Sequence, residues 1–366
     1  MKVLLIGSEP ADYTIAYANS VARHAPVTLV LPNAKVAQMR RWLDPAIDIK
    51  PIDWPRHSSL SNPAFLWRLT RLIGQERPDL VHVLSNTVLW MNLAVPFWHA
   101  RPLVTTVHDV RIHPGDRDTA KLPGWSPRLM ARQSPDVVVH GEALRGAAIA
   151  HFGKPEDRIH VLPHPAIRRY AELALAEGLH PTKNAGTFTV LLFGRIYAYK
   201  GLDLLIHAER LLGQRIPGLR IVVAGRGDDP RALSASMGDP ARYDIRHRFI
   251  EDREVAQLFL DADLVVLPYR EASQSGVIPV AATFAKPVVV TDVGELRATV
   301  VPHGLGLVVP PNDPQQLADA IATLADDPGL RRQFGENARI WADQITGPGA
   351  VGAQAVAIYD RILQRA

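Results

Sequence analysis

Cysteine is absent from this chain of 366 residues. Its absence excludes disulfides, zinc sites built from thiolates and iron–sulfur clusters ligated by cysteine. A chain without cysteine suits a reducing cytosol, where we expect the protein to reside. The remaining composition, 47% hydrophobic and 21% charged, is that of a globular protein. The length suits two domains better than one hydrophobic core.

Long hydrophobic runs are also lacking. The apolar N-terminal run ends at Gly7, before it reaches the length of the hydrophobic region of a secretory signal. The most apolar later run, residues 88–98, is too short to span a bilayer and contains Asn92 and Pro96. We therefore expect a cytoplasmic protein without a transmembrane segment.

Two kinds of ligand-binding motif are missing as well. No GxGxxG fingerprint follows any predicted strand, which disfavours a nicotinamide or flavin enzyme. No basic helix, zinc finger or aromatic ribonucleoprotein motif is present, so nucleic acid is not an expected partner.

Positive charge and tryptophan are concentrated in the first half. Residues 1–170 contain 21 Lys and Arg against 14 Asp and Glu, whereas the remainder contains 20 against 23. Six of the seven tryptophans also precede residue 170: Trp42, Trp54, Trp67, Trp90, Trp98 and Trp125. This pattern fits a protein that rests peripherally on anionic lipid or binds an acidic acceptor. It equally fits a solvated basic face with tryptophans in the core.

Short apolar segments alternate with helical patterns along the whole chain. Strands are predicted at 2–6, 27–31, 80–84, 103–107, 137–140, 159–162, 188–193, 220–224, 248–250, 264–267, 287–290 and 307–309. Helices are predicted at 13–23, 63–73, 143–152, 202–212, 255–261, 314–324 and 330–343. Such alternation predicts the α/β class, with parallel sheets covered by helices on both faces. The pattern pauses at 163–186, so we expect two doubly wound, Rossmann-like domains, 1–165 and 166–348. An amphipathic helix over 349–366 could join either domain, and we assign it to the first.

The segment 267–294 combines a strand, a small polar turn and a helix. Its turn consists of Ser273, Gln274, Ser275, Gly276 and Val277. A small, hydroxyl-rich turn at the start of a helix presents backbone N–H groups and the positive end of the helix dipole. The pattern therefore predicts an anion site, as a phosphate would require.

Two cations follow the strand predicted at 188–193. Arg195 and Lys200 lie five residues apart, and Gly194 and Gly201 flank them. Two cations at one turn suit two contacts with a diphosphate, although solvated cation pairs are common on surfaces. Ligands bind beyond the carboxyl ends of strands in open parallel sheets. Together with the serine turn, the pair predicts a diphosphate site.

The C-terminal half resembles the retaining glycosyltransferases of family 4. The resemblance rests on GR-x4-KG-x2-L from Gly194, Ala224-Gly225-Arg226-Gly227, the strand ending Leu267-Pro268, Ala285-Lys286-Pro287 and Asp292-Val293-Gly294-Glu295. It implies the GT-B fold, in which two Rossmann-like domains face a central cleft. It also implies an N-terminal acceptor-binding domain and a C-terminal nucleotide-sugar domain, with Arg195 and Lys200 neutralising the donor diphosphate. The fold usually needs no metal and no cofactor besides the donor.

The two-glutamate signature of that family is missing. Counting from Leu267 and from Lys286 places the two positions at Ala272 and Val280, eight residues apart. Glu271, one residue away, is expected to substitute in part for the first glutamate. A donor-binding site that differs from that of the family is expected, completed by the turn residues Ser273, Gln274, Ser275, Gly276 and Val277. The alternative is a chain that has lost activity.

The N-terminal half carries a second group of candidate residues. His108 and Asp109 directly follow the strand at 103–107, and the resemblance places such a histidine opposite the donor sugar. We therefore assign His108 and Asp109 the catalytic role, and Gly7, Ser8 and His113 the acceptor side. His108, Asp109, His113 and Asp116 could alternatively be metal ligands.

The resemblance implies transfer of a hexose from a nucleoside-diphosphate sugar to an acceptor hydroxyl, with retention. A lipid-linked or saccharide acceptor in surface polysaccharide synthesis is expected, with the protein at the inner face of the membrane. Two alternatives stay open. A non-hydrolysing sugar-nucleotide epimerase would offer more acidic and histidine side chains. A non-catalytic nucleotide-sugar-binding module would account for the missing glutamates.

Overall fold

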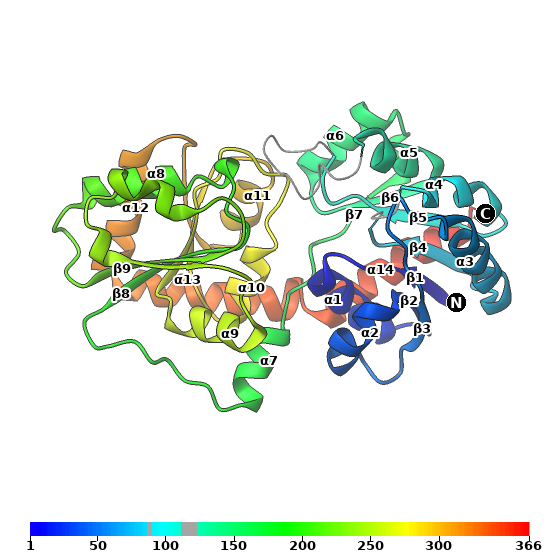
Figure 1. Cartoon of the computed structure of the whole chain (residues 1–366), viewed down its shortest axis with the longest axis horizontal. Helices are drawn as coiled ribbons and strands as arrows, with labels where there is room; N and C mark the ends of the chain where they lie inside the picture. The colour runs from blue at the N-terminus through cyan, green and yellow to red at the C-terminus, as the bar shows by residue number, and fades with distance from the viewer. Residues whose placement is uncertain (86–88, 111–122, 366) are drawn as a thin grey trace. The chain divides into compact units, whose positions relative to one another are not determined.

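The structure is a computed structural model that describes residues 1–85, 89–110 and 123–365, which form two compact units. Unit 1 contains the described residues up to Pro165 and those from Gln344 onward, and unit 2 runs from Ala166 to Asp343. Each unit is built on its own parallel sheet (Figure 1). No helix among the described residues is both long and apolar enough to cross a bilayer.

The sheet of unit 1 has seven strands in the order β3-β2-β1-β4-β5-β6-β7. All neighbouring strands are parallel. Their bounds are β1 Val3–Ile6, β2 Val27–Pro32, β3 Asp48–Ile52, β4 Leu80–Val83, β5 Leu103–Thr106, β6 Asp136–Val139 and β7 Ile159–Val161. β1, β2, β4, β5 and β6 are buried along their whole length, as expected for a parallel sheet covered on both faces.

Helices cover both faces of this sheet. They are α1 Ala11–Ala22, α2 Asn33–Met39, α3 Asn62–Glu76, α4 Met91–Ala94 with the 3-10 turn η2 Val95–Trp98, α5 Trp125–Gln133, α6 Glu142–Phe152 and α14 Pro348–Leu363. Alternate residues of β1 point to opposite faces. Val3 and Leu5 pack with α1 and α14, whereas Leu4 and Ile6 pack with α3 and α4. Unit 1 is therefore doubly wound.

The C-terminal helix α14 packs on α1 of unit 1. The hydroxyl groups of Tyr17 and Tyr359 lie 2.8 Å apart, and both side chains are fully buried. Gly352 permits the close approach, because a Cβ at this position would lie 1.9 Å from the carbonyl oxygen of Ser20. The last helix thus contributes to the core of the first unit.

Unit 2 has a six-stranded sheet in the order β10-β9-β8-β11-β12-β13, again parallel throughout. Its strands are β8 Phe188–Phe193, β9 Leu219–Gly225, β10 Tyr243–His247, β11 Leu264–Leu267, β12 Val288–Thr291 and β13 Gly306–Val309. Its helices are α7 Arg169–Ala176, α8 Leu202–Leu212, α9 Asp252–Asp261, α10 Val277–Thr283, α11 Leu296–Val300, α12 Pro314–Asp326 and α13 Pro328–Ile340. The predicted α/β class with two Rossmann-like domains is confirmed.

Two edge strands differ from the prediction. β3 was not predicted, because its sequence Asp-Ile-Lys-Pro-Ile lacks an apolar run and contains Pro51. An edge strand tolerates proline, since the missing N–H can face away from the sheet. The strand predicted at 248–250 is wrong: β10 ends at His247.

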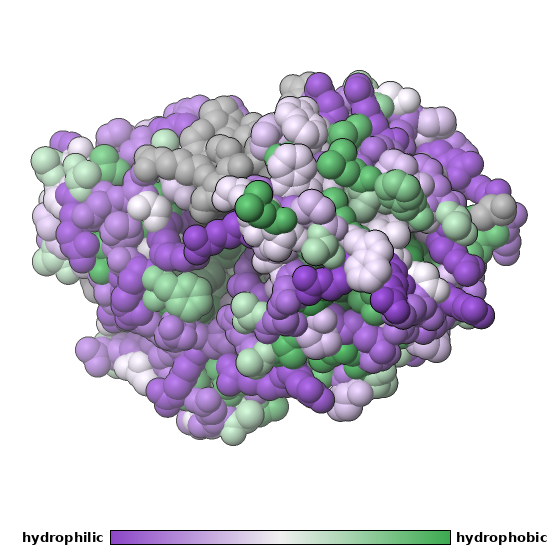
Figure 2. Space-filling model, turned by 45° about the vertical axis from the view of Figure 1, so that its right-hand side comes forward, coloured by the Kyte–Doolittle hydropathy of each residue, from purple (hydrophilic) through white to green (hydrophobic). Residues whose placement is uncertain are grey.

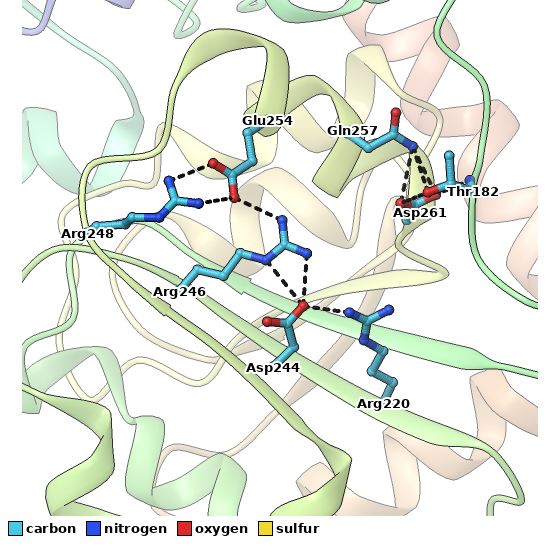
Figure 3. Close-up of polar contacts among 8 residues, drawn as sticks. All are labelled: Thr182, Arg220, Asp244, Arg246, Arg248, Glu254, Gln257 and Asp261. Carbon is cyan, nitrogen blue, oxygen red and sulfur yellow. Dashed lines mark hydrogen bonds and ion pairs between the residues drawn. The ribbon is translucent and has the colours of Figure 1, made fainter.

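β10 was not predicted because it contains charged side chains and no apolar run. Asp244 accepts hydrogen bonds from Arg246 and Arg220, and Glu254 accepts from Arg246 and Arg248 (Figure 3). These ion pairs form on the outer strand of the sheet, where charge also discourages pairing with another chain. A search for apolar runs therefore misses this strand.

Candidate functional site

The loops after β8 and β11 pack directly on each other. The two strands are neighbours in the sheet, so their carboxyl ends meet at one edge. Gly201 has φ +71°, and a Cβ there would lie 1.8 Å from the carbonyl oxygen of Pro268. The amide of Arg270 donates to the carbonyl of Tyr199 at 2.8 Å. Only glycine fits at position 201 without moving the second loop.

Lys200 is held over aromatic rings at this edge. Its Nζ lies 3.7 Å from the ring centroid of Tyr269 and 4.9 Å from that of Tyr199. A cation in this position is attracted by the ring faces. The backbone turn η5 Ala198–Lys200 and the aromatic rings therefore fix the ammonium group beside the loop that follows β11.

Arg270 joins the same two loops through ion pairing. Its guanidinium donates to both carboxylate oxygens of Asp203, at 2.7 and 2.5 Å, and to the carbonyl of Ala198 at 3.0 Å. The pair holds the pKa of Asp203 below its usual range. The carboxylate of Asp203 is thus paired to Arg270 and leaves Lys200 to its aromatic partners.

The serine turn leads into a short helix. The Ser275 hydroxyl lies 3.3 Å from the Tyr269 hydroxyl and accepts a hydrogen bond from the amide of Val277 at 3.3 Å. Val277 begins α10, which is only seven residues long. A Cβ on Gly194 would lie 3.9 Å from the Val277 side chain. The segment carrying Arg195 therefore runs beside the start of α10, and the Arg195 side chain is exposed.

The positions of the missing glutamates differ in their surroundings. Val280 is buried in α10, whereas Glu271 is exposed. Ala272 and Ser273 lie against a third loop: a Cβ on Gly294 would be 2.0 Å from the Ala272 carbonyl oxygen, and the amide of Glu295 donates to the Ser273 carbonyl at 3.1 Å. Glu295 is the buried carboxylate beside this turn.

In unit 1 the predicted residues lie at the carboxyl edge of the sheet. Gly7 follows β1, and a Cβ there would lie 2.9 Å from Thr14 Oγ1. Ser8 is buried. His108 follows β5, and its Nε2 donates to the carbonyl of Leu84 at 3.0 Å. Burial lowers the pKa of His108, and the charge of Asp109 opposes that shift.

His113 and Asp116 lie outside the described residues. Within the described residues, no three His, Cys, Asp or Glu side chains are grouped to hold a metal ion.

Three groups of residues at these edges were not predicted as site residues. Tyr269 contacts both Lys200 and Ser275, and its signal in the sequence is an aromatic residue just after a strand. Glu295 appeared only as part of a motif. Around His108 lie Tyr13, His140 and His164, each less than 5.5 Å from a neighbouring ring centroid. His140 and His164 also follow strands, which is the signal that could have revealed them.

Sequence comparison assigns a family to each unit. Residues 13–166 match the family described as Glycosyltransferase Family 4, and residues 187–327 match Glycosyl transferases group 1. The chain carries the two domains of a GT-B glycosyltransferase.

Relatives of this glycosyltransferase are identical to it at just under a third of the aligned residues. It is 29% identical over 279 residues to the alpha-D-kanosaminyltransferase of Streptomyces kanamyceticus, covering 71% of each chain. It is 29% identical over 307 residues to the D-inositol 3-phosphate glycosyltransferase of Corynebacterium glutamicum, covering 77% of this chain and 72% of the relative.

Solved structures share the fold at lower identity. The Anabaena protein Alr3699/HepE in complex with UDP-glucose aligns with a TM-score of 0.73 at 19% identity, over 99% of this chain and 100% of that one. The UDP-GlcNAc 2-epimerase of Neisseria meningitidis bound to UDP-GlcNAc aligns with a TM-score of 0.65 at 15% identity, over 99% and 100%. Both similarities concern the fold alone.

Proposed function

We propose that this glycosyltransferase moves a hexose from a nucleoside-diphosphate sugar to an acceptor hydroxyl, with retention of the anomeric configuration. Unit 2 binds the donor and unit 1 the acceptor. The observation that carries the proposal is the edge of the unit 2 sheet, where Lys200 and the Ser275 turn lie on two interlocked loops. A cation and a turn with backbone amides are the groups that a diphosphate requires.

The proposed roles of the site residues follow from the position at which negative charge develops during sugar transfer. As the sugar leaves, negative charge grows on the β-phosphate, and Lys200, Arg195 and the amides near Ser275–Val277 stabilise it. The acceptor proton passes to the departing phosphate on the same face of the sugar. No protein nucleophile is then needed, in agreement with the apolar residues Ala272 and Val280 at the signature positions.

Product analysis tests this proposal. The full chain is incubated with UDP-glucose, UDP-GlcNAc and GDP-mannose, and nucleoside diphosphate and sugar products are followed by NMR. Release of nucleoside diphosphate with an α-configured sugar product supports the proposed reaction. A β-configured sugar as the first-formed product from these α-linked donors would contradict retention. Binding without turnover would show a nucleotide-sugar-binding module.

The imidazoles of unit 1 are the observation that favours the epimerase as a second candidate. His108, His140 and His164 gather at one edge of the sheet, as expected for an enzyme rich in histidine. However, burial lowers the pKa of all three, which makes them poor bases at neutral pH. Interconversion of UDP-GlcNAc and UDP-ManNAc in the same NMR experiment would establish the epimerase.

We further propose that unit 1 contacts an anionic membrane that carries a lipid-linked or saccharide acceptor for surface polysaccharide synthesis. The candidate surface, the aromatic patch, comprises Trp67, Leu93, Phe97 and Trp125, which are exposed by 61, 60, 75 and 54%. Leu93 and Phe97 lie four residues apart on the helical segment of α4 and η2, which contacts both α3 and α5. Figure 1 places α4 between these two helices.

Charge around the aromatic patch suits anionic lipid. Residues 54–75, 80–108 and 123–135, which contain α4, η2, α5 and all of α3 except its last residue, Glu76, have no Asp or Glu. They include the exposed cations Arg68, Arg71, Arg101, Arg128 and Arg132. Figure 2, which turns this side forward, shows exposed hydrophobic residues among hydrophilic ones. Aromatic side chains beside cations are typical of protein surfaces at the lipid headgroup level.

A further inference from the structure

Four rings form a cluster at the carboxyl edge of the unit 1 sheet. The Tyr13 ring centroid lies 4.4 Å from that of His108, 5.1 Å from His140 and 5.3 Å from His164. His140 lies 5.3 Å from both other imidazoles. The histidines follow β5, β6 and β7, the last three strands in the order of the sheet. Parallel strand order therefore brings three imidazoles, distant in sequence, to one place.

Backbone carbonyls fix the tautomer of each imidazole. Nε2 of His108 faces the carbonyl of Leu84 at 3.0 Å, Nδ1 of His140 faces that of Leu162 at 3.0 Å, and Nδ1 of His164 faces that of Pro165 at 2.9 Å. A carbonyl oxygen only accepts, so each of these nitrogens must carry the proton. The other nitrogen of each neutral ring is an acceptor.

Burial keeps the cluster neutral. It lowers the pKa of His164 to about 4 and that of His140 well below its usual value, and the neighbouring imidazoles add to both shifts. Asp109 acts in the opposite direction, on His108. At neutral pH the cluster therefore offers lone pairs rather than positive charge.

His140 has an acceptor atom without a partner. The side chain is 8% exposed, and its Nε2 forms no hydrogen bond with any described residue. An unsatisfied buried acceptor costs about 1–3 kcal/mol. His82, in the same unit, shows the opposite situation: its Nδ1 lies 2.7 Å from the Tyr359 hydroxyl and its Nε2 2.9 Å from Thr106 Oγ1.

The chemistry of the cluster selects a ligand class. Neutral imidazole nitrogens accept hydrogen bonds from hydroxyl groups, whereas the oxygens of a dianionic phosphate monoester have no proton to donate to them. A lone pair beside the apolar face of Tyr13 is thus suited to a neutral sugar or cyclitol. The orphaned acceptor of His140 would be satisfied by one hydroxyl group.

We infer that His108, His140 and His164 form a subsite that binds the hydroxyl groups of a neutral polyol, with His140 Nε2 as the central acceptor. The inference rests on the proposed function, in which unit 1 holds the acceptor, and it specifies that a neutral polyol face of the acceptor lies here. A phosphate on the acceptor would lie elsewhere.

Imidazole NMR of the full chain labelled with ¹⁵N-histidine tests the subsite. Glycerol and myo-inositol are titrated to molar-range concentrations at neutral pH, and the His140→Leu variant assigns the His140 signals. We expect the unprotonated Nε2 of His140 to shift saturably with both polyols and to stay unchanged with sulfate, an anion that has no proton to donate. We also expect His140→Leu to weaken polyol binding about tenfold, as read from the His164 signals.

His82 provides the matched control, because both of its nitrogens are already hydrogen-bonded. If His140 shifts no more than His82, or responds to sulfate and not to polyols, the inference is wrong. The wild-type titration decides this even if the variant fails to fold. Binding of UDP to the same sample tests the proposed function separately. Bound UDP without a polyol response would overturn the subsite alone, whereas a polyol response without UDP binding would contradict the donor assignment.

Discussion

The ammonium of Lys200 lies 3.7 Å from the ring centroid of Tyr269, although 69 positions separate the two residues in the chain. The contact joins the loop after β8 to the loop after β11. Lys200 is thereby positioned beside the Ser275 turn, to which Tyr269 is also hydrogen-bonded. One tyrosine thus links the cation and the turn that together form the proposed diphosphate site.

Removal of the Lys200 ammonium should remove stabilisation of the departing phosphate. We expect Lys200→Ala to lower kcat/KM for the donor about 10²–10³-fold, as loss of one charge-stabilising group does. The measurement is release of nucleoside diphosphate at varied donor concentration. Arg332→Ala, which removes an exposed cation on α13 of the same unit, is the control and should behave as wild type. Equal turnover by the two variants would exclude Lys200 from the site.

Gly201 should tolerate no side chain. With φ +71° and a Cβ position 1.8 Å from the Pro268 carbonyl oxygen, Gly201→Ala is expected to lose at least about 1–3 kcal/mol of unfolding free energy. The reason is that the two loops would have to separate. Chemical denaturation measures the change. Gly276→Ala, at φ −67° with no atom within 4 Å, should change stability by less than about 0.5 kcal/mol. Similar losses in both variants would show that the loops do not interlock.

The buried imidazoles should make unit 1 sensitive to acid. Their unfolded pKa is about 6.5, whereas burial lowers that of His164 to about 4 and that of His82 to about 3. His140 shifts in the same direction. Because the unfolded chain binds more protons, stability is full above pH 6.5 and falls as the pH drops towards 4. Each histidine contributes up to about 1.4 kcal/mol per pH unit.

Tryptophan fluorescence can follow this loss, since six of the seven tryptophans belong to unit 1. Urea midpoints between pH 7.5 and about 5.5 isolate the histidines, because carboxylates of ordinary pKa stay almost fully ionised in that range. A midpoint that stays constant over this range would mean that the imidazoles are not held neutral by burial.

The aromatic patch should be required for membrane contact. We expect Phe97→Glu to reduce co-sedimentation with vesicles containing phosphatidylserine by about tenfold, because it places an anion in an apolar, cation-lined surface. Leu175→Glu is the matched control: Leu175 is 85% exposed on α7, which belongs to unit 2 and not to the unit that carries the patch. Retention of Phe97→Glu at the wild-type level, or release of both variants alike, would argue against this surface.

The central strands of both sheets could be predicted because they are buried on both faces and read as apolar runs. β3 and β10 could not be located, since edge strands carry Pro51 and ion-paired side chains that interrupt such runs. Lys200 and Ser275 could be proposed as phosphate-binding residues because they lie in the loops that follow strands β8 and β11.

Contacts between loops required the structure. Spacing in the sequence does not show that Tyr269 reaches Lys200, or that Glu295 packs against the serine turn. The three imidazoles follow three different strands, and only the order of the sheet places them together. The sequence also did not show which side of the α4 and η2 segment is exposed. Apolar residues occur on both sides of it, and Trp98 in the same segment is buried.

A crystal of the full chain soaked with UDP or GDP would show where the diphosphate binds. We expect a diphosphate in contact with Lys200 Nζ and with the backbone amides around Ser275–Val277. A diphosphate bound away from the loops that follow β8 and β11, or no binding of either nucleotide at saturating concentration, would contradict it.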